Sequence, residues 1–182
     1  VEDFIQGLYS YIVPPVYPNE FGAKIYKITR DENGNRLTHM KITGGKLKVR
    51  DTLTHNKWED KVNQIRIYSG NKYEIVNEVT PGTVCAVTGL STSLPGEGLG
   101  YEESNYVPLI EPVLVYRLIL PHDCDPRGIL PKLKQLEEEE PELKIIWDEQ
   151  LQEIQLRVMG EMQLEILQLL ILERFGILVG FA

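Results

Sequence analysis

The sequence of 182 residues has few of the residues on which metal binding, disulfide bonding or membrane insertion depends. Its two cysteines, Cys85 and Cys124, cannot form a disulfide framework or supply the four ligands of a structural zinc site. The three histidines, His39, His55 and His122, are far apart in the sequence. Because no run of about 18 consecutive apolar residues occurs, no membrane-spanning helix is expected.

The motifs of common enzymes are also missing. There is no G-x-x-x-x-G-K-[ST] phosphate loop, and no serine or cysteine lies in a nucleophile elbow. The segment "GEGLG" at residues 96–100 has no helix predicted after it, so we interpret it as a flexible connector rather than a dinucleotide site. "HDCD" at residues 122–125 matches no closed metal site. We therefore expect no catalytic, cofactor-binding or metal-binding residue in this chain.

The first residues lack the basic region and cleavage site of a secretory signal. Together with the low cysteine content, this predicts a reduced, cytoplasmic protein with no membrane partner. An enzyme site between two domains is the least favoured interpretation, because no acid, base or nucleophile constellation is visible.

Charge is distributed unevenly along the chain. The net charge is −8, yet residues 24–72 contain twelve basic and five acidic residues, a net of +7, which leaves −15 for the rest. Such an asymmetry indicates that the two parts meet different surroundings. A polyanionic partner for the basic part is one interpretation. A solvated β surface of mixed charge is the alternative.

The first two thirds of the chain predict a short helix followed by strands. Apolar residues at helical spacing occupy residues 1–12, and Pro14-Pro15 should end that helix and begin an extended linker. From residue 21 to about 110, short strands alternate with turns, among them Asn33-Gly34 and Pro81-Gly82. With no helix between the strands, this pattern predicts an all-β barrel or sandwich.

From residue 111 the pattern changes to α+β. A strand is followed by a helix that begins at Asp125-Pro126, then by two strands that turn near Gln150, a second helix and a last strand. This β-α-β-β-α-β order predicts a ferredoxin-like split βαβ domain. The second helix should end at Gly176 in a left-handed cap.

The second helix is apolar on more than one side. Met162, Ile166, Leu169 and Leu170 form a helical stripe, and further leucines lie outside it, so we expect the helix to be covered on more than one side. Packing does not explain three polar residues at its start, which are therefore candidates for contact with a partner: Glu161, Gln163 and Glu165.

Three segments together resemble the translational GTPases. "RLTHMKITGGKLKVRDTL" at residues 36–53 looks like the second domain of that family, and "NEVTPGTVCAVTGL" at residues 77–90 resembles the barrel strand that follows. "LKQLEEEEPELKIIWDEQLQEIQLRVMGEMQLEIL" at residues 133–167 is similar to domain III of elongation factor G. The chain departs from the domain III pattern at Glu140, where the family has aspartate, at Val158, where it has glycine, and at Gln163, where it has histidine.

At the position of Gln163 the ribosomal protection proteins, which confer tetracycline resistance, usually have glutamine, and the chain resembles them in this. We therefore interpret the chain as similar to that group or to elongation factor G. A release factor 3-type paralogue without a resistance role, and a free-standing RNA-binding module, remain alternatives. The resemblance implies three parts. Residues 1–20 would be the end of a GTPase domain plus a linker, residues 21–110 a β-barrel domain II, and residues 111–182 a ferredoxin-like domain III.

The resemblance implies a separate function for each of these parts. Domain II would dock on small-subunit rRNA, and domain III would contact a small-subunit protein and relay the GTP state between domains. GTP and Mg would belong to the GTPase domain of a parent protein, which would act as a monomer. Four basic residues are the rRNA-binding candidates, because three of them alternate along one predicted strand and should share a face: Lys41, Lys46, Lys48 and Arg50.

Overall fold

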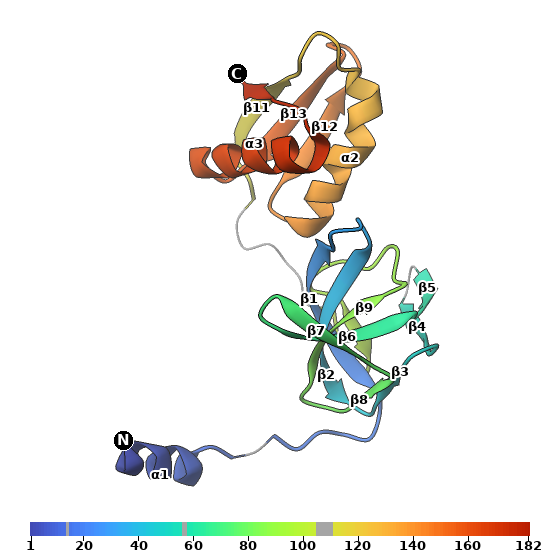
Figure 1. Ribbon diagram of the computed structural model, residues 1–182, viewed down its shortest axis with the longest axis vertical. Helices are drawn as coiled ribbons and strands as arrows, with labels where there is room; N and C mark the ends of the chain where they lie inside the picture. The colour runs from blue at the N-terminus through green and yellow to red at the C-terminus, as the bar shows by residue number, and fades with distance from the viewer. Residues whose placement is uncertain (14, 56–57, 105–110) are drawn as a thin grey trace. The chain divides into compact units, whose positions relative to one another are not determined.

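The computed structural model describes residues 1–13, 15–55, 58–104 and 111–182 (Figure 1). The chain falls into two compact units, the first of which ends at Ser104. Three segments lie outside the described residues: residue 14, residues 56–57 and residues 105–110. The predicted domain boundary after residue 110 falls at the end of the last of them. Among the described residues, no helix is long and apolar enough to cross a membrane.

The first unit begins with helix α1 (Glu2–Tyr11), which lies where the apolar spacing predicts a helix. None of its residues is buried, and Phe4, Tyr9 and Tyr11 are 70%, 81% and 88% exposed. The helix therefore contributes nothing to the core of this unit.

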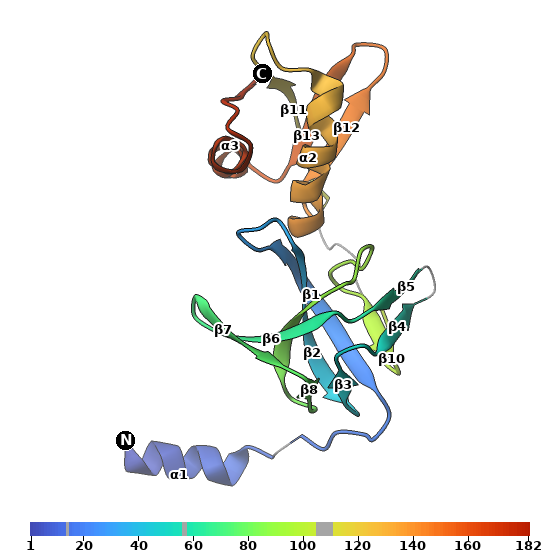
Figure 2. The ribbon, with the colours of Figure 1, turned by 45° about the vertical axis from the view of Figure 1, so that its right-hand side comes forward.

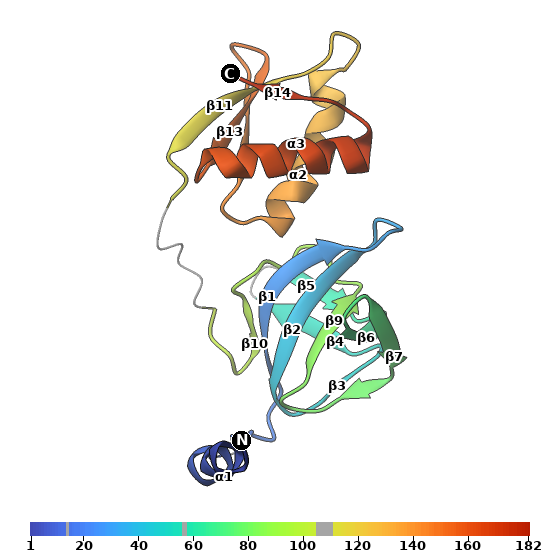
Figure 3. The same cartoon turned by 60° about the vertical axis from the view of Figure 1, so that its left-hand side comes forward.

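Strands make up the rest of the first unit. Six of them form one sheet in the order β10-β1-β2-β9-β6-β7, and Figure 3 shows β1, β2 and β9 curving side by side. Two short antiparallel pairs, β3 with β8 and β4 with β5, complete the unit (Figure 2). The bounds are β1 (Gly22–Arg30), β2 (Arg36–Gly44), β3 (Leu47–Lys48), β4 (Thr52–His55), β5 (Trp58–Lys61), β6 (Gln64–Ser69), β7 (Lys72–Val76), β8 (Glu78–Val79), β9 (Val84–Thr88) and β10 (Gly98–Gly100).

Alternation of apolar and polar residues places one side of these strands in a core. Ile25 and Ile28 of β1 are buried, whereas Lys24 and Lys27 are exposed. The predicted Asn33-Gly34 turn is present: Gly34 has φ +77°, and the Asp31 carboxylate accepts backbone hydrogen bonds from Asn33 and Asn35. The β1–β2 hairpin is therefore fixed by local turn chemistry.

The interpretation of residues 96–100 as a flexible connector is wrong for Gly98–Gly100, which form β10 and pair with β1. Glycine is required at Gly100 for this pairing, because a Cβ there would collide with the Phe21 carbonyl oxygen. The sequence analysis also did not identify β7 as a separate strand. Tyr73 and Ile75 of β7 lie on one face of the sheet and are 47% and 55% exposed.

The second unit has a four-stranded antiparallel sheet in the order β12-β13-β11-β14 and two helices. The chain order of its elements is β-α-β-β-α-β. Residues of both helices and of one sheet face share a single core, so both helices cover that face. The bounds are β11 (Leu114–Ile119), α2 (Pro126–Glu139), β12 (Lys144–Asp148), β13 (Glu153–Val158), α3 (Glu161–Phe175) and β14 (Gly180–Phe181).

The predicted helix ends are confirmed. The Asp125 carboxylate accepts hydrogen bonds from the backbone N–H groups of Arg127 and Gly128, and Pro126 occupies the first helical position of α2. At the end of α3, Gly176 has φ +68°, and its N–H donates to the Leu172 carbonyl oxygen.

The expectation that α3 is covered on more than one side is wrong for the described residues. Its buried face is Leu164, Leu167 and Ile171. The predicted stripe lies mainly on the other side, where Met162, Ile166 and Leu169 are 77%, 55% and 59% exposed. Because α3 is apolar around most of its circumference, residue spacing did not determine which face would meet the sheet.

Candidate nucleic-acid interface

The structure divides the four basic candidates of the first unit into two pairs. The Nζ atoms of Lys46 and Lys48 lie 2.8 and 3.3 Å from the two carboxylate oxygens of Glu78. These two lysines therefore share a face, as predicted. Hydrogen bonds from them lower the pKa of Glu78, which keeps the carboxylate charged and partly neutralises the pair.

Arg50 does not lie on the strand predicted for it. Strand β3 ends at Lys48, and Arg50 has φ +76°. The Asp51 carboxylate accepts the Lys48 N–H at 2.8 Å, which turns the chain before Arg50. The prediction that Arg50 shares a strand face with the two lysines is therefore wrong.

Lys41 and Arg50 are the two candidates that remain available for an anion. Lys41 is exposed on β2 and Arg50 is exposed at the turn. Neither side chain makes an ion pair with a described residue. Their charges are therefore not offset by a neighbouring carboxylate in this part of the chain.

The three candidates of the second unit lie in the first turns of α3. Glu161 and Glu165 are exposed and one helical turn apart. The Gln163 side chain is instead half-buried, and its Oε1 accepts a hydrogen bond from the Met159 N–H at 2.9 Å. Gln163 thus fixes the chain where β13 turns into α3.

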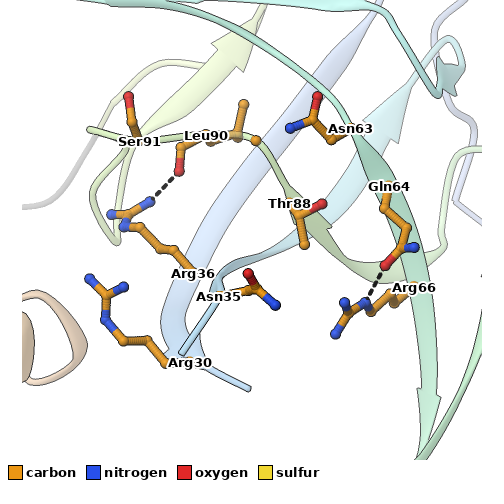
Figure 4. Close-up of a pocket in the computed structure, with 10 residues that line it drawn as sticks. Arg30, Asn35, Arg36, Asn63, Gln64, Arg66, Thr88, Leu90 and Ser91 are labelled. Atoms are coloured by element: carbon orange, nitrogen blue, oxygen red, sulfur yellow. Dashed lines mark hydrogen bonds between the residues drawn. The ribbon is translucent and has the colours of Figure 1, made fainter. Parts of the chain in front are cut away.

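A pocket of about 610 Å³ lies at one end of the six-stranded sheet (Figure 4). Three arginines from different segments converge on it: one ends β1, one begins β2 and one lies on β6. Side-chain amides and a hydroxyl add further hydrogen-bonding groups. The lining residues are Arg30, Asn35, Arg36, Asn63, Gln64, Arg66, Thr88, Gly89, Leu90 and Ser91.

Arg36 ties this pocket to the loop after β9. Its Nη1 donates hydrogen bonds to the Leu90 carbonyl oxygen and the Ser93 Oγ, both at 2.9 Å, and to the Thr38 Oγ1 at 3.2 Å. Thr38 and Ser93 are fully buried, and their hydroxyl oxygens are 3.0 Å apart. These acceptors are neutral oxygen atoms, and their hydrogen bonds fix the orientation of the Arg36 guanidinium.

Arg66 forms the opposite wall of the pocket. Its Nε donates to the Gln64 Oε1 at 2.6 Å, its Nη1 lies 3.0 Å from the Asp31 Oδ2, and its guanidinium lies 4.5 Å from the Tyr73 ring centroid. Burial raises the pKa of Asp31, but hydrogen bonds from Asn35, Arg66 and Asn33 outweigh it and hold that pKa below its ordinary value. The ion pair is therefore present at neutral pH.

The arrangement suits an anion with several oxygen atoms. Guanidinium groups form directional, charge-assisted hydrogen bonds to phosphate, and amide side chains can supplement them. Arg30 and Arg36 flank the Asn33-Gly34 turn, so the predicted hairpin alone places them on adjacent strands. Nothing in the sequence indicates that Arg66 joins them, because the strand order of the sheet is needed for that.

Comparison with known proteins relates the chain to translation factors. Residues 20–99 match the family described as elongation factor G domain 2. An elongation factor G 2 from Syntrophus aciditrophicus (strain SB) is 27% identical over 161 residues, which are 85% of this chain and 23% of that protein. An elongation factor G 1 from Syntrophomonas wolfei subsp. wolfei is 29% identical over 163 residues, 85% of this chain and 24% of that protein.

One further relative and one solved structure are also similar to the chain. An elongation factor 2 from Methanocaldococcus jannaschii is 25% identical over 158 residues, 82% of this chain and 22% of that protein. A crystal structure of a protein from Thermus thermophilus has the same fold, with a TM-score of 0.78 and 21% identity over 100% of this chain and 29% of that one. The chain thus spans about a quarter of the length of these curated relatives. Together the matches show that the chain is similar to elongation factors G and 2.

Proposed function

We propose that the chain is the central part of a translational GTPase and docks on the ribosome. One observation carries the proposal: the segment with net charge +7, residues 24–72, lies entirely within the 20–99 match to elongation factor G domain 2. A basic surface on a ribosome-binding domain would neutralise rRNA phosphates. The first unit would then be domain II and the second unit domain III.

The folds of the two units are assigned on the same basis. The first unit is assigned to the elongation-factor domain II type of β-barrel, which its antiparallel sheet and the family match support. The second is assigned to the ferredoxin-like folds, which the β-α-β-β-α-β order and the strand order β12-β13-β11-β14 support.

Docking would use a different chemistry in each unit. In the first, Lys41 and Arg50 and the arginine-lined pocket would contact small-subunit rRNA, with Lys46 and Lys48 contributing less because Glu78 offsets their charge. In the second, the exposed Glu161 and Glu165 at the start of α3 would contact a basic small-subunit protein. A monomer suffices for both contacts.

The catalytic step would lie outside this chain. GTP and Mg would be bound by the GTPase domain of the parent protein, and the two units described here would relay its nucleotide state to the distal domains. The protein would act in the cytoplasm, where ribosomes translate. This division of labour is consistent with the absence of a phosphate-loop motif from the sequence.

The choice between translocation and tetracycline resistance depends largely on Gln163. Its side chain bonds the Met159 backbone N–H, which is a local role at the start of α3. We therefore propose an elongation-factor-G-like role, with ribosomal protection as the alternative. Tetracycline tolerance of cells expressing the parent protein would decide between them.

Co-sedimentation of the 182-residue chain with bacterial 30S subunits over a salt series tests ribosome docking. A Lys41→Ala/Arg50→Ala variant removes two charges from the first unit, and Lys132→Ala/Lys144→Ala removes two from the second as a control. We expect salt-sensitive binding that weakens in the first variant, with the slope of log K against log salt reduced by about 1.5. Absence of binding at low salt, or equal weakening in both variants, would contradict the proposal.

A further inference from the structure

A row of four ring side chains crosses the outer face of the six-stranded sheet. Tyr26 of β1, His39 of β2, Tyr68 of β6 and Tyr73 of β7 are successive neighbours in this row. Their ring centroids are 6.1, 6.0 and 5.3 Å apart in that order, with interplanar angles of 54°, 40° and 46°. We call these four residues the ring row.

Strand register explains how residues so far apart in sequence meet. His39 lies opposite Ala86 on β9, and Ala86 lies opposite Arg66 on β6, so these three side chains share one face. Tyr68 and Tyr73 are paired directly across β6 and β7. Strand β9 lies between β2, which carries His39, and β6, which carries Tyr68. Because the Ala86 side chain on β9 is small, the two rings still come into contact above it.

The ring row is turned away from the core. The neighbouring residues Met40 and Ile65 are fully buried on the inner face. Tyr26, Tyr68 and Tyr73 are 51%, 37% and 47% exposed, although aromatic side chains gain most stability when buried. Three of the four rings are therefore substantially exposed, although the core of this unit lies on the other face of the sheet.

Positive charge borders the ring row. Lys41 is two residues from His39 on β2, and Lys24 is two residues from Tyr26 on β1, so each projects to the same face as its ring. Lys24 is paired with Glu102 at 3.3 Å, whereas Lys41 makes no ion pair with a described residue. Arg66 links the row to the arginine-lined pocket, because it lines that pocket and also lies against Tyr73.

We propose that the ring row binds unpaired bases of single-stranded RNA by stacking, while Lys41 and the arginine-lined pocket hold the adjoining phosphates. Exposed rings beside cations are the combination that single-stranded nucleic acid requires, since each base offers a π face and each nucleotide a negative charge. Base faces in a duplex are already stacked on each other and are not available to the row. The inference rests on the proposed ribosome docking and specifies unpaired rRNA nucleotides as the ligand.

Fluorescence anisotropy with a labelled oligouridine of about 12 nucleotides, and with an RNA duplex of equal length, tests the inference on the whole chain. A Tyr26→Leu/Tyr73→Leu variant removes two rings and retains apolar side chains. Tyr26→Phe/Tyr73→Phe retains both rings, and Tyr9→Leu/Tyr11→Leu changes two exposed tyrosines of α1 as a matched control. Thermal unfolding of each variant checks that it is folded.

We expect oligouridine to bind more tightly than the duplex, and the leucine variant of the ring row to bind it at least about tenfold more weakly. The phenylalanine variant and the α1 control should bind like the unchanged protein. Equal affinity for the duplex, or loss of affinity in the phenylalanine variant as large as in the leucine variant, would overturn the stacking role.

The same variants in the 30S experiment separate this inference from the proposed function. If the chain binds 30S subunits but the leucine variant binds them equally well, the stacking inference fails and ribosome docking stands. If oligouridine binds through the rings but 30S subunits do not bind, docking fails and the stacking surface stands. Ring-dependent binding to 30S subunits but not to protein-free 16S rRNA would indicate a protein ligand and overturn the RNA assignment.

Discussion

Arg66 on β6 is joined to Asp31, 35 residues earlier, by an ion pair with 3.0 Å between Nη1 and Oδ2. Both side chains are largely buried, with 9% and 13% of their surface exposed. Asp31 opens the turn between β1 and β2, so this pair fastens the hairpin to the far part of the sheet. It also holds Arg66 in place between the pocket and Tyr73.

Replacing Arg66 with alanine should lower the free energy of unfolding by about 3 kcal/mol, because it leaves the Asp31 carboxylate largely buried without its partner. Arg66→Lys should cost less, since it keeps the charge but loses the hydrogen-bond fork. Urea unfolding followed by circular dichroism measures both. Lys72→Ala, at an exposed position of β7, should change stability by less than about 0.5 kcal/mol. An Arg66→Ala effect as small as that of Lys72→Ala would show that the ion pair does not stabilise the hairpin.

The stabilisation from Asp31 should depend on pH. Its pKa in the folded protein is lowered, so its contribution is complete above its unfolded-state pKa of about 3.9 and is lost as pH falls through the lower folded value. The stability difference between the unchanged protein and Asp31→Asn should therefore be constant from about pH 7 to 5 and shrink below about pH 4. Denaturant unfolding across this range measures it. Glu32→Gln, at the exposed neighbouring position, is the matched control for the loss of one negative charge.

The two cysteines should differ in reactivity. Burial raises the pKa of the Cys85 thiol to about 12, and only 2% of this residue is exposed. Cys124 is only partly buried. With a thiol reagent at about pH 8, about one thiol per chain, that of Cys124, should react in the native protein, and about two should react in the denatured protein. A Cys124→Ser variant that still reacts quickly in the native state would contradict the buried position of Cys85.

Asp125 should stabilise the start of α2. Its carboxylate accepts hydrogen bonds from the N–H groups of Arg127 at 3.1 Å and Gly128 at 2.9 Å. Asp125→Ala should therefore cost about 1 kcal/mol. Asp123→Ala removes an equal charge two residues earlier and should cost much less, so comparison of their urea midpoints separates capping from net charge. Equal midpoints would remove the capping explanation.

Two glycines with positive φ should respond differently to alanine. Gly176 has φ +68° with open space around its Cβ position, so Gly176→Ala should cost about 1–2 kcal/mol from backbone strain alone. Gly100 has φ +65°, and its Cβ would collide with the Phe21 carbonyl oxygen. Gly100→Ala should cost about 4 kcal/mol, because strain and displacement of β1 add. Differential scanning calorimetry of both variants measures the contrast, and equal losses would show that the β10–β1 approach is not close.

Local chemistry made much of the fold predictable. Asn33-Gly34, Asp125-Pro126 and Gly176 act within a few residues of themselves, and the structure has a turn, a helix start and a helix end at those positions. The alternating strand β1 and the apolar strand β11 were also expected from the sequence. Strand β10 was missed because its partner β1 lies more than 70 residues earlier in the sequence, which residue spacing does not reveal. Strand β7 was missed although its partner β6 directly precedes it.

The candidate site was less predictable for the same reason. The basic segment was visible in the sequence, but Glu78, which partly offsets the charge of Lys46 and Lys48, lies about 30 residues beyond them. Arg50 was misplaced because the Asp51 side chain turns the backbone before it. The pocket and the ring row depend on the order of strands in the sheet, so neither could be found without it.

Strand β10 determines where the first unit can be cut. The Gly98 N–H donates to the Ser104 Oγ at 3.1 Å, the Tyr101 hydroxyl donates to the Thr43 carbonyl oxygen at 2.6 Å, and Gly98–Gly100 pair with β1. A shortened protein that stops before residue 98 would lose all three attachments and expose the backbone of β1 as a free edge open to self-association. The glycine-rich segment, which looks like a place for a protease to cleave or for an insertion, is thus part of the scaffold on which the ring row and the pocket are built.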